Sequence, residues 1–205
     1  PVGKDSLSMR SVWQDEDGER SVTAPISLIV SAFAPVRDIR GALTPELRRD
    51  AGDTRLLLID LGEGRNRLGG SALAQVHGGV GNNPPDLDDP ALLRRFFDAI
   101  QALNDANLVL AYHDRSDGGL FATLCEMAFA GGSGLKVDLE PLTAQALPAL
   151  FNEELGAVIQ IPAHELESVY SILGHHGLDV LSHDIGKPSP DPAIRIRMGE
   201  QLLLD

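Results

Sequence analysis

The sequence predicts an α+β protein with α/β-type layering, in which helices pack on one mixed sheet. Two observations support this prediction. Short apolar runs with the composition of buried strands occur at 55–61, 108–112 and 157–161. Longer runs, such as 93–103 and 120–131, carry apolar residues at helical spacing. Strands and helices that succeed one another in this way are typical of a sheet covered by helices.

Residues 13–34 are predicted to form a charged hairpin tip followed by a strand. Residues 13–22 are charged and contain Asp17-Gly18, which is a signal for a hairpin turn. A metal site would also use such an acidic run, but a solvated turn explains it more simply. Residues 26–34 alternate and are rich in β-forming residues, so they predict a strand that ends at Pro35.

The middle of the chain predicts two helices before the strand at 108–112. Residues 68–77 are expected to form a helix with Leu68, Ala72, Leu73 and Val76 on one face. Asp89 and Pro90 form a helix start, since aspartate caps helices and proline suits the first helical position. The stripe that follows is expected to face the core: Leu93, Phe96, Phe97, Ile100 and Leu103.

The chain after residue 131 predicts four more strands and two more helices besides the strand at 157–161. Helices are expected at 143–150 and 163–173, and strands at 135–139, 178–183, 193–198 and 201–204. Gly199-Glu200 joins the last two strands and predicts a closing hairpin.

Charge and composition narrow the classes of partner and the cellular location. The net charge is −13 and the pI is near 4.7, which argues against nucleic acid or an anionic membrane as a main partner. No run approaches the roughly 18 apolar residues of a membrane span. Cys125 is the single cysteine, so no internal disulfide can form. A reducing compartment, and therefore a cytoplasmic location, is expected.

The strand at 108–112 leads into the polar run His113, Asp114, Arg115, Ser116 and Asp117, and then into two glycines and a helix. A helix start offers free N–H groups and a positive dipole end, and carboxylates beside it suit Mg²⁺. The segment therefore predicts an anion or metal site. A polar turn that only joins a strand to a helix has the same pattern, and spacing alone leaves both interpretations open.

Two further segments carry candidate binding residues. Near the N-terminus, the backbone amides around Gly3, the Lys4 ammonium and the Ser6 hydroxyl are groups that bind phosphate. Glu153 and Glu154 stand at the entrance of the strand at 157–161, where paired acids serve as a general base or a substrate clamp. A solvated turn and a solvated loop, respectively, remain open as alternatives.

The polar run and its surroundings resemble a known family. H-D-R-S-D-G-G-L followed by E-M-A-F-A-G resembles phosphoribosylformylglycinamidine synthase of the large, single-chain type. Further similar segments occur in the same order along most of the chain, and similarity fades after about Pro162. They are P-V-G-K-D-S-L-S-M (1–9), L-I-V-S-A-F-A-P-V (28–36), L-L-L-I-D-L-G (56–62), L-G-G-S-A-L-A-Q-V (68–76) and L-F-N-E-E-L-G-A-V-I-Q (150–160).

The resemblance implies a fold and a division of the chain. Residues 1–36 would be the C-terminal tail of an AIR synthase-like N-terminal domain, and residues 37–205 an AIR synthase-like C-terminal domain. The chain would be a fragment from the second synthase half of a much longer enzyme. Its partners would be the first synthase half and the glutaminase domain. A sheet edge left open by their absence would favour self-association of the fragment.

The resemblance also implies a reaction. The family is an ATP-dependent carbon–nitrogen ligase that uses glutamine as amido donor and converts formylglycinamide ribonucleotide to formylglycinamidine ribonucleotide in purine biosynthesis. The cofactors would be Mg²⁺ and ATP or ADP. Such phosphoryl transfer depends on positioning and charge neutralisation. The fragment alone is expected to be inactive, and the alternative is a non-catalytic, nucleotide-holding scaffold module of a larger synthase.

The roles that the resemblance implies fall on eight residues. Asp114 would bind Mg²⁺, and the nucleotide would contact Ser116, Gly3 and Lys4. Ser6, Asn152, Glu153 and Glu154 would contact the substrate, and no residue is expected to be catalytic in itself. In the large type, the nucleotide of this region resembles a retained structural ADP, so Asp114 would be a true ligand in a structural role.

Overall fold

The computed structural model describes residues 2–6, 9–24, 27–36, 38–142 and 145–205. The chain divides into two compact units, Pro1–Ala42 and Leu43–Asp205. This division lies a few residues after the predicted boundary at Val36. Each unit is described by itself below.

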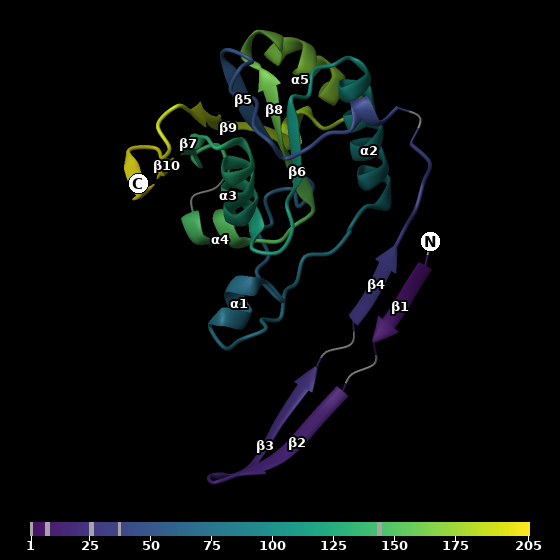
Figure 1. The fold of residues 1–205 in the computed structure, drawn as a ribbon, viewed down its shortest axis with the longest axis vertical. Coiled ribbons are helices and arrows are strands. Elements are labelled where there is room, and N and C mark those ends of the chain that lie inside the picture. The colour runs from purple at the N-terminus through teal and green to yellow at the C-terminus, as the bar shows by residue number, and fades with distance from the viewer. Residues whose placement is uncertain (1, 7–8, 25–26, 37, 143–144) are drawn as a thin grey trace. The chain divides into compact units, whose positions relative to one another are not determined.

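The first unit consists of two antiparallel strand pairs (Figure 1). Strand β1 (Val2–Ser6) pairs with β4 (Ser27–Ser31), and β2 (Met9–Asp15) pairs with β3 (Gly18–Ala24). The predicted hairpin is confirmed, because Asp15 lies opposite Gly18 and Arg20 forms ion pairs with Asp15 and Asp17. A short 3-10 helix, η1 (Ile39–Gly41), ends the unit. None of its described side chains is buried, as expected for strand pairs that no second layer covers within the unit.

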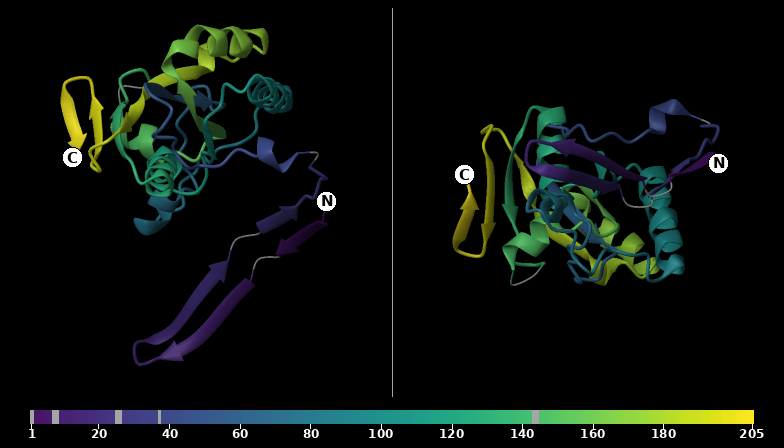
Figure 2. Two further views of the ribbon diagram at one scale, coloured as in Figure 1. Left: turned by 45° about the horizontal axis from the view of Figure 1, so that its top comes forward. Right: turned by 90° about the horizontal axis from the view of Figure 1, so that it is seen from below.

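The second unit is built on a seven-stranded sheet with the order β11-β10-β7-β9-β5-β8-β6. Among the described strands of this sheet only the β7–β10 pair is parallel, so the predicted mixed sheet is confirmed. The hairpin of β10 and β11, drawn in yellow in Figure 2, forms one edge, and β6 forms the other. The strands are β5 (Thr54–Asp60), β6 (Ala111–Asp114), β7 (Gly134–Asp138), β8 (Gly156–Pro162), β9 (Ser182–Ser189), β10 (Ile194–Met198) and β11 (Gln201–Leu204).

Helices cover both faces of this sheet (Figure 1). Helices α3 (Gly119–Gly131) and α4 (Ala146–Phe151) lie on one face, and α2 (Pro90–Asp105) and α5 (Leu166–His175) lie on the other. Two 3-10 helices, η2 (Ala163–Glu165) and η3 (Asp179–Leu181), flank α5. The short helix α1 (Ala72–Val76) carries no buried residue. The predicted α+β architecture with layered helices is therefore confirmed.

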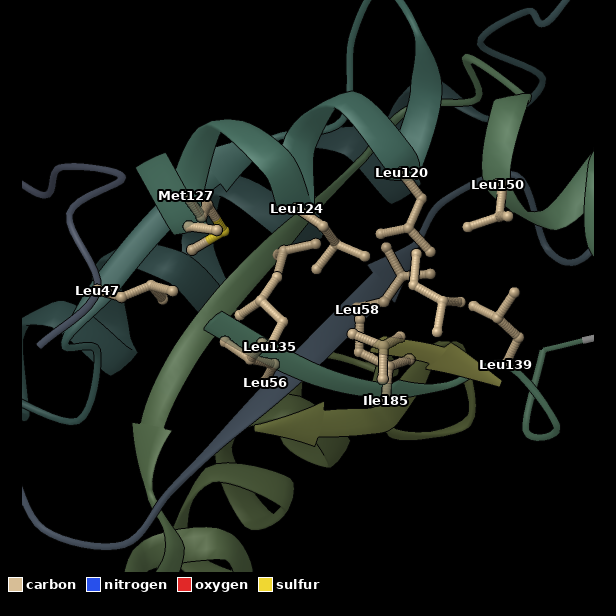
Figure 3. Packing of buried hydrophobic residues seen from close by; sticks show 14 of the residues in the cluster. Leu47, Leu56, Leu58, Leu120, Leu124, Met127, Leu135, Leu139, Leu150 and Ile185 are labelled. Atoms are coloured by element: carbon tan, nitrogen blue, oxygen red, sulfur yellow. The ribbon is translucent and has the colours of Figure 1, made fainter. Parts of the chain in front are cut away.

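Strand β5 shows why its sequence is almost continuously apolar. Leu56 and Leu58 belong to the hydrophobic cluster under α3, whereas Leu57 and Ile59 belong to the cluster under α2 and α5. Successive side chains of a strand point to opposite faces, so a strand covered on both sides must be apolar at every position. Figure 3 shows the first cluster, with Leu120, Leu124 and Met127 over the sheet. Each fully buried leucine contributes roughly 1.5–3 kcal/mol.

Helix α2 begins where the sequence predicts, but two of the residues that were expected to face the core are exposed. The Asp89 carboxylate accepts a hydrogen bond from the Ala91 N–H at 2.9 Å, and Pro90 occupies the first turn. Leu93 is 38% exposed and Phe97 is 60% exposed, so their expected burial was wrong. The helix is rotated so that a neighbouring stripe faces the core: Leu92, Phe96, Ala99, Ile100 and Leu103.

The predicted helix at 68–77 is shorter than expected. It begins at Ala72, where the Ser71 hydroxyl accepts a hydrogen bond from the Ala74 N–H. Gly70 has a φ of +75°, and a Cβ on Gly69 would lie 2.5 Å from the Asn83 carbonyl carbon, so this Gly-Gly pair forms a tight turn instead. Val76 is 82% exposed, which contradicts the expected apolar face.

The C-terminal elements follow the prediction in part. The hairpin of β10 and β11 is confirmed, with Gly199 at a φ of +57° in the turn. The strand expected at 178–183 was wrong, since residues 179–181 form η3 and β9 begins at Ser182. Of the helix expected at 143–150, residues 143–144 lie outside the described residues and α4 begins at Ala146. In the described parts of the chain, no helix is both long and apolar enough to cross a membrane.

Candidate functional site

The candidate site lies at the end of the sheet where β5 and β6 stop and β8 begins. Asp60 is opposite Gly156 and Asp114 is opposite Ala157, because β8 runs antiparallel to both neighbours. The loops after Asp60 and Asp114 therefore meet the loop before Gly156. This brings together the predicted residues Asp114 and Ser116 and the predicted segment 152–154, which are far apart in sequence.

The loop after β6 turns its polar side chains alternately outward and inward. Asp114 and Ser116 are exposed, whereas Arg115 between them is 4% exposed. The Tyr112 hydroxyl donates a hydrogen bond to Asp114 Oδ1 at 2.5 Å. Burial raises the pKa of Tyr112, and the Asp114 hydrogen bond raises it further. The Asp114 carboxylate is thus accessible to a ligand and is oriented by a neighbouring hydroxyl.

His113 is half-buried and has two hydrogen-bonding partners. Its Nε2 lies 2.7 Å from Glu126 Oε2 on α3, and its Nδ1 lies 2.8 Å from the Asp114 carbonyl oxygen. Thr123 also donates to the Asp114 carbonyl, at 3.1 Å. These contacts connect α3 to the end of β6, which favours a structural hydrogen-bonding role for His113.

The two glycines at the start of α3 allow this helix to lie close to the loop that follows α4. Gly118 and Gly119 have φ values of +84° and +67°. A Cβ on Gly119 would lie 2.5 Å from the Asn152 carbonyl oxygen and 2.7 Å from that of Leu150. Only glycine tolerates both the left-handed backbone and this close approach. The space that a side chain would need at Gly119 is therefore filled by the protein's own backbone, not reserved for a ligand.

The predicted substrate segment forms the other wall of the site. Asn152 is fully buried, and its Nδ2 donates to Asn66 Oδ1 at 2.9 Å and to the Pro148 carbonyl at 2.6 Å. Glu153 Oε1 accepts hydrogen bonds from the Gly118 and Ala72 N–H groups, each at 2.8 Å. Glu153 thus joins the first turn of α1 to the residue that caps α3, and it satisfies N–H groups that helix starts leave unpaired.

Glu154 is 1% exposed and forms an ion pair with Arg67. The Arg67 guanidinium also contacts Asp88 at 2.8 Å, and Glu154 and Asp88 together raise the pKa of Arg67. These contacts attach the loop that follows β5 to the start of β8. The three predicted residues 152–154 all have internal partners, and Glu153 is the least buried of them.

Sequence reasoning missed three charged residues of this site: Asp60, Arg67 and Arg115. Asp60 accepts hydrogen bonds from the Gly62 N–H at 3.1 Å and the Gly64 N–H at 2.7 Å, and from Arg115 Nη2 at 2.5 Å. A carboxylate that ends an apolar strand just before two glycines was the available signal for Asp60. Arg115 stood inside the recognised motif, but its burial depends on a partner far away in sequence.

His183 lies near this buried ion pair. Burial lowers the pKa of His183, the Asp60 carboxylate acts in the opposite direction, and the Arg115 guanidinium lowers it further. The net lowering favours the neutral imidazole.

Metal-ligating groups are sparse in the described part of the chain. No group of three or more His, Cys, Asp or Glu side chains among the described residues could hold a metal ion. Asp114 therefore offers one carboxylate and no complete ligand set within those residues. The predicted residues Gly3, Lys4 and Ser6 belong to β1 in the first unit, and their side chains lie outside those described.

The fold and this cluster of loops define a class, an α+β domain with a mixed sheet between two helical layers and a polar site at the sheet end. Comparison with protein-family models then gives the particular family. The model "AIR synthase related protein, C-terminal domain" matches residues 51–199, so the chain belongs to this family. A second model, "FGAR-AT PurM_N-like domain", matches residues 1–35.

Solved structures show the same fold. The structure of PurLQS from Thermotoga maritima matches with a TM-score of 0.63 and 12% identity, over 87% of this chain and 27% of that one. T. maritima PurL complexed with ATP matches with a TM-score of 0.63 and 14% identity, over 91% and 28%. Escherichia coli HypE, a hydrogenase maturation protein, matches with a TM-score of 0.51 and 20% identity, over 76% and 48%. This chain thus spans little more than a quarter of the two Thermotoga chains.

Proposed function

We propose that this chain is part of a phosphoribosylformylglycinamidine synthase of the large, single-chain type. The whole enzyme is the ATP- and glutamine-dependent ligase described above, and this part contributes one side of a Mg²⁺-nucleotide site. Two matches in chain order support the proposal, at residues 1–35 and 51–199. The observation that carries it is the loop after β6, which exposes Asp114 and Ser116 beside the start of α3.

The ligands named for similar structures agree with this proposal. Structures of T. maritima PurL are described as complexes with ATP, AMPPCP, FGAR and ADP. We carry these ligand classes to this chain as part of the proposal, because the likeness at 12–15% identity is one of fold. The remaining domains of the parent enzyme would be its protein partners, and its location would be the cytoplasm.

The residues of the loop fit a Mg²⁺ ion that is shared with a nucleotide. Mg²⁺ is usually held by one or two carboxylates together with phosphate oxygens and water, so the exposed Asp114 carboxylate is by itself a sufficient protein contribution. When bound, the ion neutralises phosphate charge. The Tyr112 hydroxyl orients the Asp114 carboxylate, and the exposed Ser116 hydroxyl is free to face the nucleotide.

The other predicted residues are proposed to contact the substrate or the nucleotide. Glu153 and its neighbours Asn152 and Glu154 form the wall toward the substrate, and their internal hydrogen bonds hold that wall in one conformation. Gly3 and Lys4 would contact nucleotide and Ser6 substrate. A retained ADP in a structural role would account for a site in which the Asp60, Glu153 and Glu154 carboxylates are all bound to partners within the protein.

The test uses the natural full-length chain. Wild type and Asp114→Asn are purified and denatured, and the released nucleotide and Mg²⁺ are quantified beside ligase activity. We expect wild type to release about one ADP and the mutant to lose both nucleotide and stability. Asp98→Asn, on the surface of α2, removes the same charge away from the site and is the control.

Each other result has a distinct meaning. Unchanged nucleotide content with lower activity would assign Asp114 to the turning-over site. Retained nucleotide in a chain without any ligase activity would favour the scaffold module. A mutant that equals wild type in nucleotide content, activity and stability would overturn the Mg²⁺-nucleotide assignment.

A further inference from the structure

Arg115 lies within the proposed nucleotide loop, but its side chain points into the protein. The side chain is 1% exposed. Its Nε donates to the Glu154 carbonyl oxygen at 2.6 Å, and its Nη2 donates to the Leu155 carbonyl at 2.9 Å and to Asp60 Oδ1 at 2.5 Å. One guanidinium thus binds three acceptors on two chain segments, which come from β5 and from the entrance of β8.

These hydrogen bonds of the Arg115 guanidinium determine the direction in which the neighbouring side chains point. The Arg115 N–H donates to the Gly156 carbonyl oxygen at 2.8 Å, which continues the pairing of β6 with β8 by one residue. In an extended segment, successive side chains point to opposite sides. With Arg115 held inside, Asp114 and Ser116 on either side of it must face outward, and both are exposed.

Asp60 connects Arg115 to the loop that follows β5. Its carboxylate accepts the N–H groups of Gly62 and Gly64 in addition to Arg115. A buried carboxylate without its cation would be strongly destabilised, so the two charges depend on each other. The planar guanidinium presents several donors in fixed directions, which a lysine ammonium on a flexible stem does not reproduce.

We infer that Arg115 is a positioning residue, which sets the Asp114 carboxylate and the Ser116 hydroxyl for Mg²⁺ and nucleotide through its bonds to Asp60 and to the Glu154 and Leu155 carbonyls. This inference rests on the proposed function. It goes beyond it because Arg115 itself touches neither ion nor nucleotide.

The experiment measures binding of ADP with Mn²⁺ as the probe. It uses the natural full-length chain freed of nucleotide, at a temperature where circular dichroism shows every variant to be folded. The variants are Arg115→Lys, Arg115→Met and Asp60→Asn. We expect the dissociation constant to rise at least about tenfold for Arg115→Met and less for Arg115→Lys. The electron paramagnetic resonance spectrum of bound Mn²⁺ should change in both, because the carboxylate ligand is displaced.

A matched control separates positioning from stability. Gln160 is fully buried on β8 at the other end of the strand, where it bonds to the backbone of Arg48 and to Thr54. Gln160→Met should lower the melting temperature without changing ADP affinity or the Mn²⁺ spectrum. If the Arg115 and Asp60 variants behave like Gln160→Met, Arg115 is only a structural residue and the inference is wrong.

Asp114→Asn distinguishes this inference from the proposed function. If Asp114→Asn binds Mn²⁺ and ADP like wild type, the proposed site itself fails. If Asp114→Asn weakens binding but the Arg115 variants do not, only the positioning role fails. Arg115→Lys keeps a positive charge opposite Asp60, so it provides the comparison if Arg115→Met does not fold.

Discussion

The carboxylate of Glu154 and the guanidinium of Arg67 form a bidentate ion pair. Nε lies 2.7 Å from Oε1, and Nη2 lies 2.8 Å from Oε2. The side chains are 1% and 10% exposed. The Arg67 backbone N–H also donates to Glu154, at 3.0 Å. This pair therefore closes the loop after β5 onto the start of β8, and it forms part of the wall of the candidate site.

Removing the cation of this pair should lower the stability of the protein. Arg67→Met leaves the Glu154 carboxylate buried without its cation, so we expect a loss of about 3 kcal/mol in the free energy of unfolding. Arg197→Met breaks a more exposed pair with Asp138 and should cost less than about 1 kcal/mol. Urea unfolding of both variants measures the difference. Equal losses would contradict the importance of the buried pair.

The packing of Gly119 can be tested against Gly132, the left-handed glycine that caps the C-terminal end of α3. Gly119→Ala should cost about 3 kcal/mol or more, since left-handed strain adds to a clash with the Asn152 and Leu150 carbonyls. Gly132→Ala has the same kind of strain at a φ of +55° but meets no atom within 4 Å, and it should cost about 1 kcal/mol. Thermal unfolding decides, and a Gly119→Ala variant as stable as Gly132→Ala would refute the close approach.

Acidification should destabilise the protein in part through His183. Burial holds the pKa of folded His183 below its usual value, so the unfolded chain binds the proton more readily. Stability that is present above about pH 6.5 is therefore lost as the pH falls through that value toward the folded pKa. His183→Asn should show a smaller drop in melting temperature than wild type between pH 7.5 and 5.5. The exposed His77→Asn should match wild type, and an unchanged drop in His183→Asn would disprove this account.

Cys125 should react slowly with thiol reagents in the folded protein. Burial raises the pKa of its thiol, and the adjacent Glu126 raises it further, so little thiolate is present at pH 8. We expect alkylation to be several-fold slower than in urea-unfolded protein, and Glu126→Gln to accelerate it. Glu167→Gln, which changes an exposed side chain of α5, is the control. Reaction of the folded protein at the unfolded rate would show that the thiol is not protected.

Local sequence signals predicted elements whose ends are set by neighbouring residues. The Asp89-Pro90 start, the Asp17-Gly18 hairpin and the turn at Gly199 depend on a few adjacent positions, and all three are present. The predictions that were wrong concern which face of a helix is buried. Leu93, Phe97 and Val76 are apolar at helical spacing but exposed, because a neighbouring stripe of α2 packs on the sheet and α1 packs on no core.

The sequence by itself determined the layered α+β class, the places of most strands and helices, and the polar loop that carries Asp114 and Ser116. These features follow from apolar periodicity, turn residues and a motif that lies within one short segment. The roles of Asp114 and Ser116 stay predictions until nucleotide and metal binding are measured.

Only the tertiary structure decided that Asp60, Arg115 and Glu154 meet. They lie on three segments, and the antiparallel register of β8 with β5 and β6 brings those segments to one end of the sheet. Burial of an arginine depends on acceptors that are distant in sequence, and strand pairing alone supplies them. The outward position of the predicted ligands is therefore a consequence of the sheet, which no local pattern encodes.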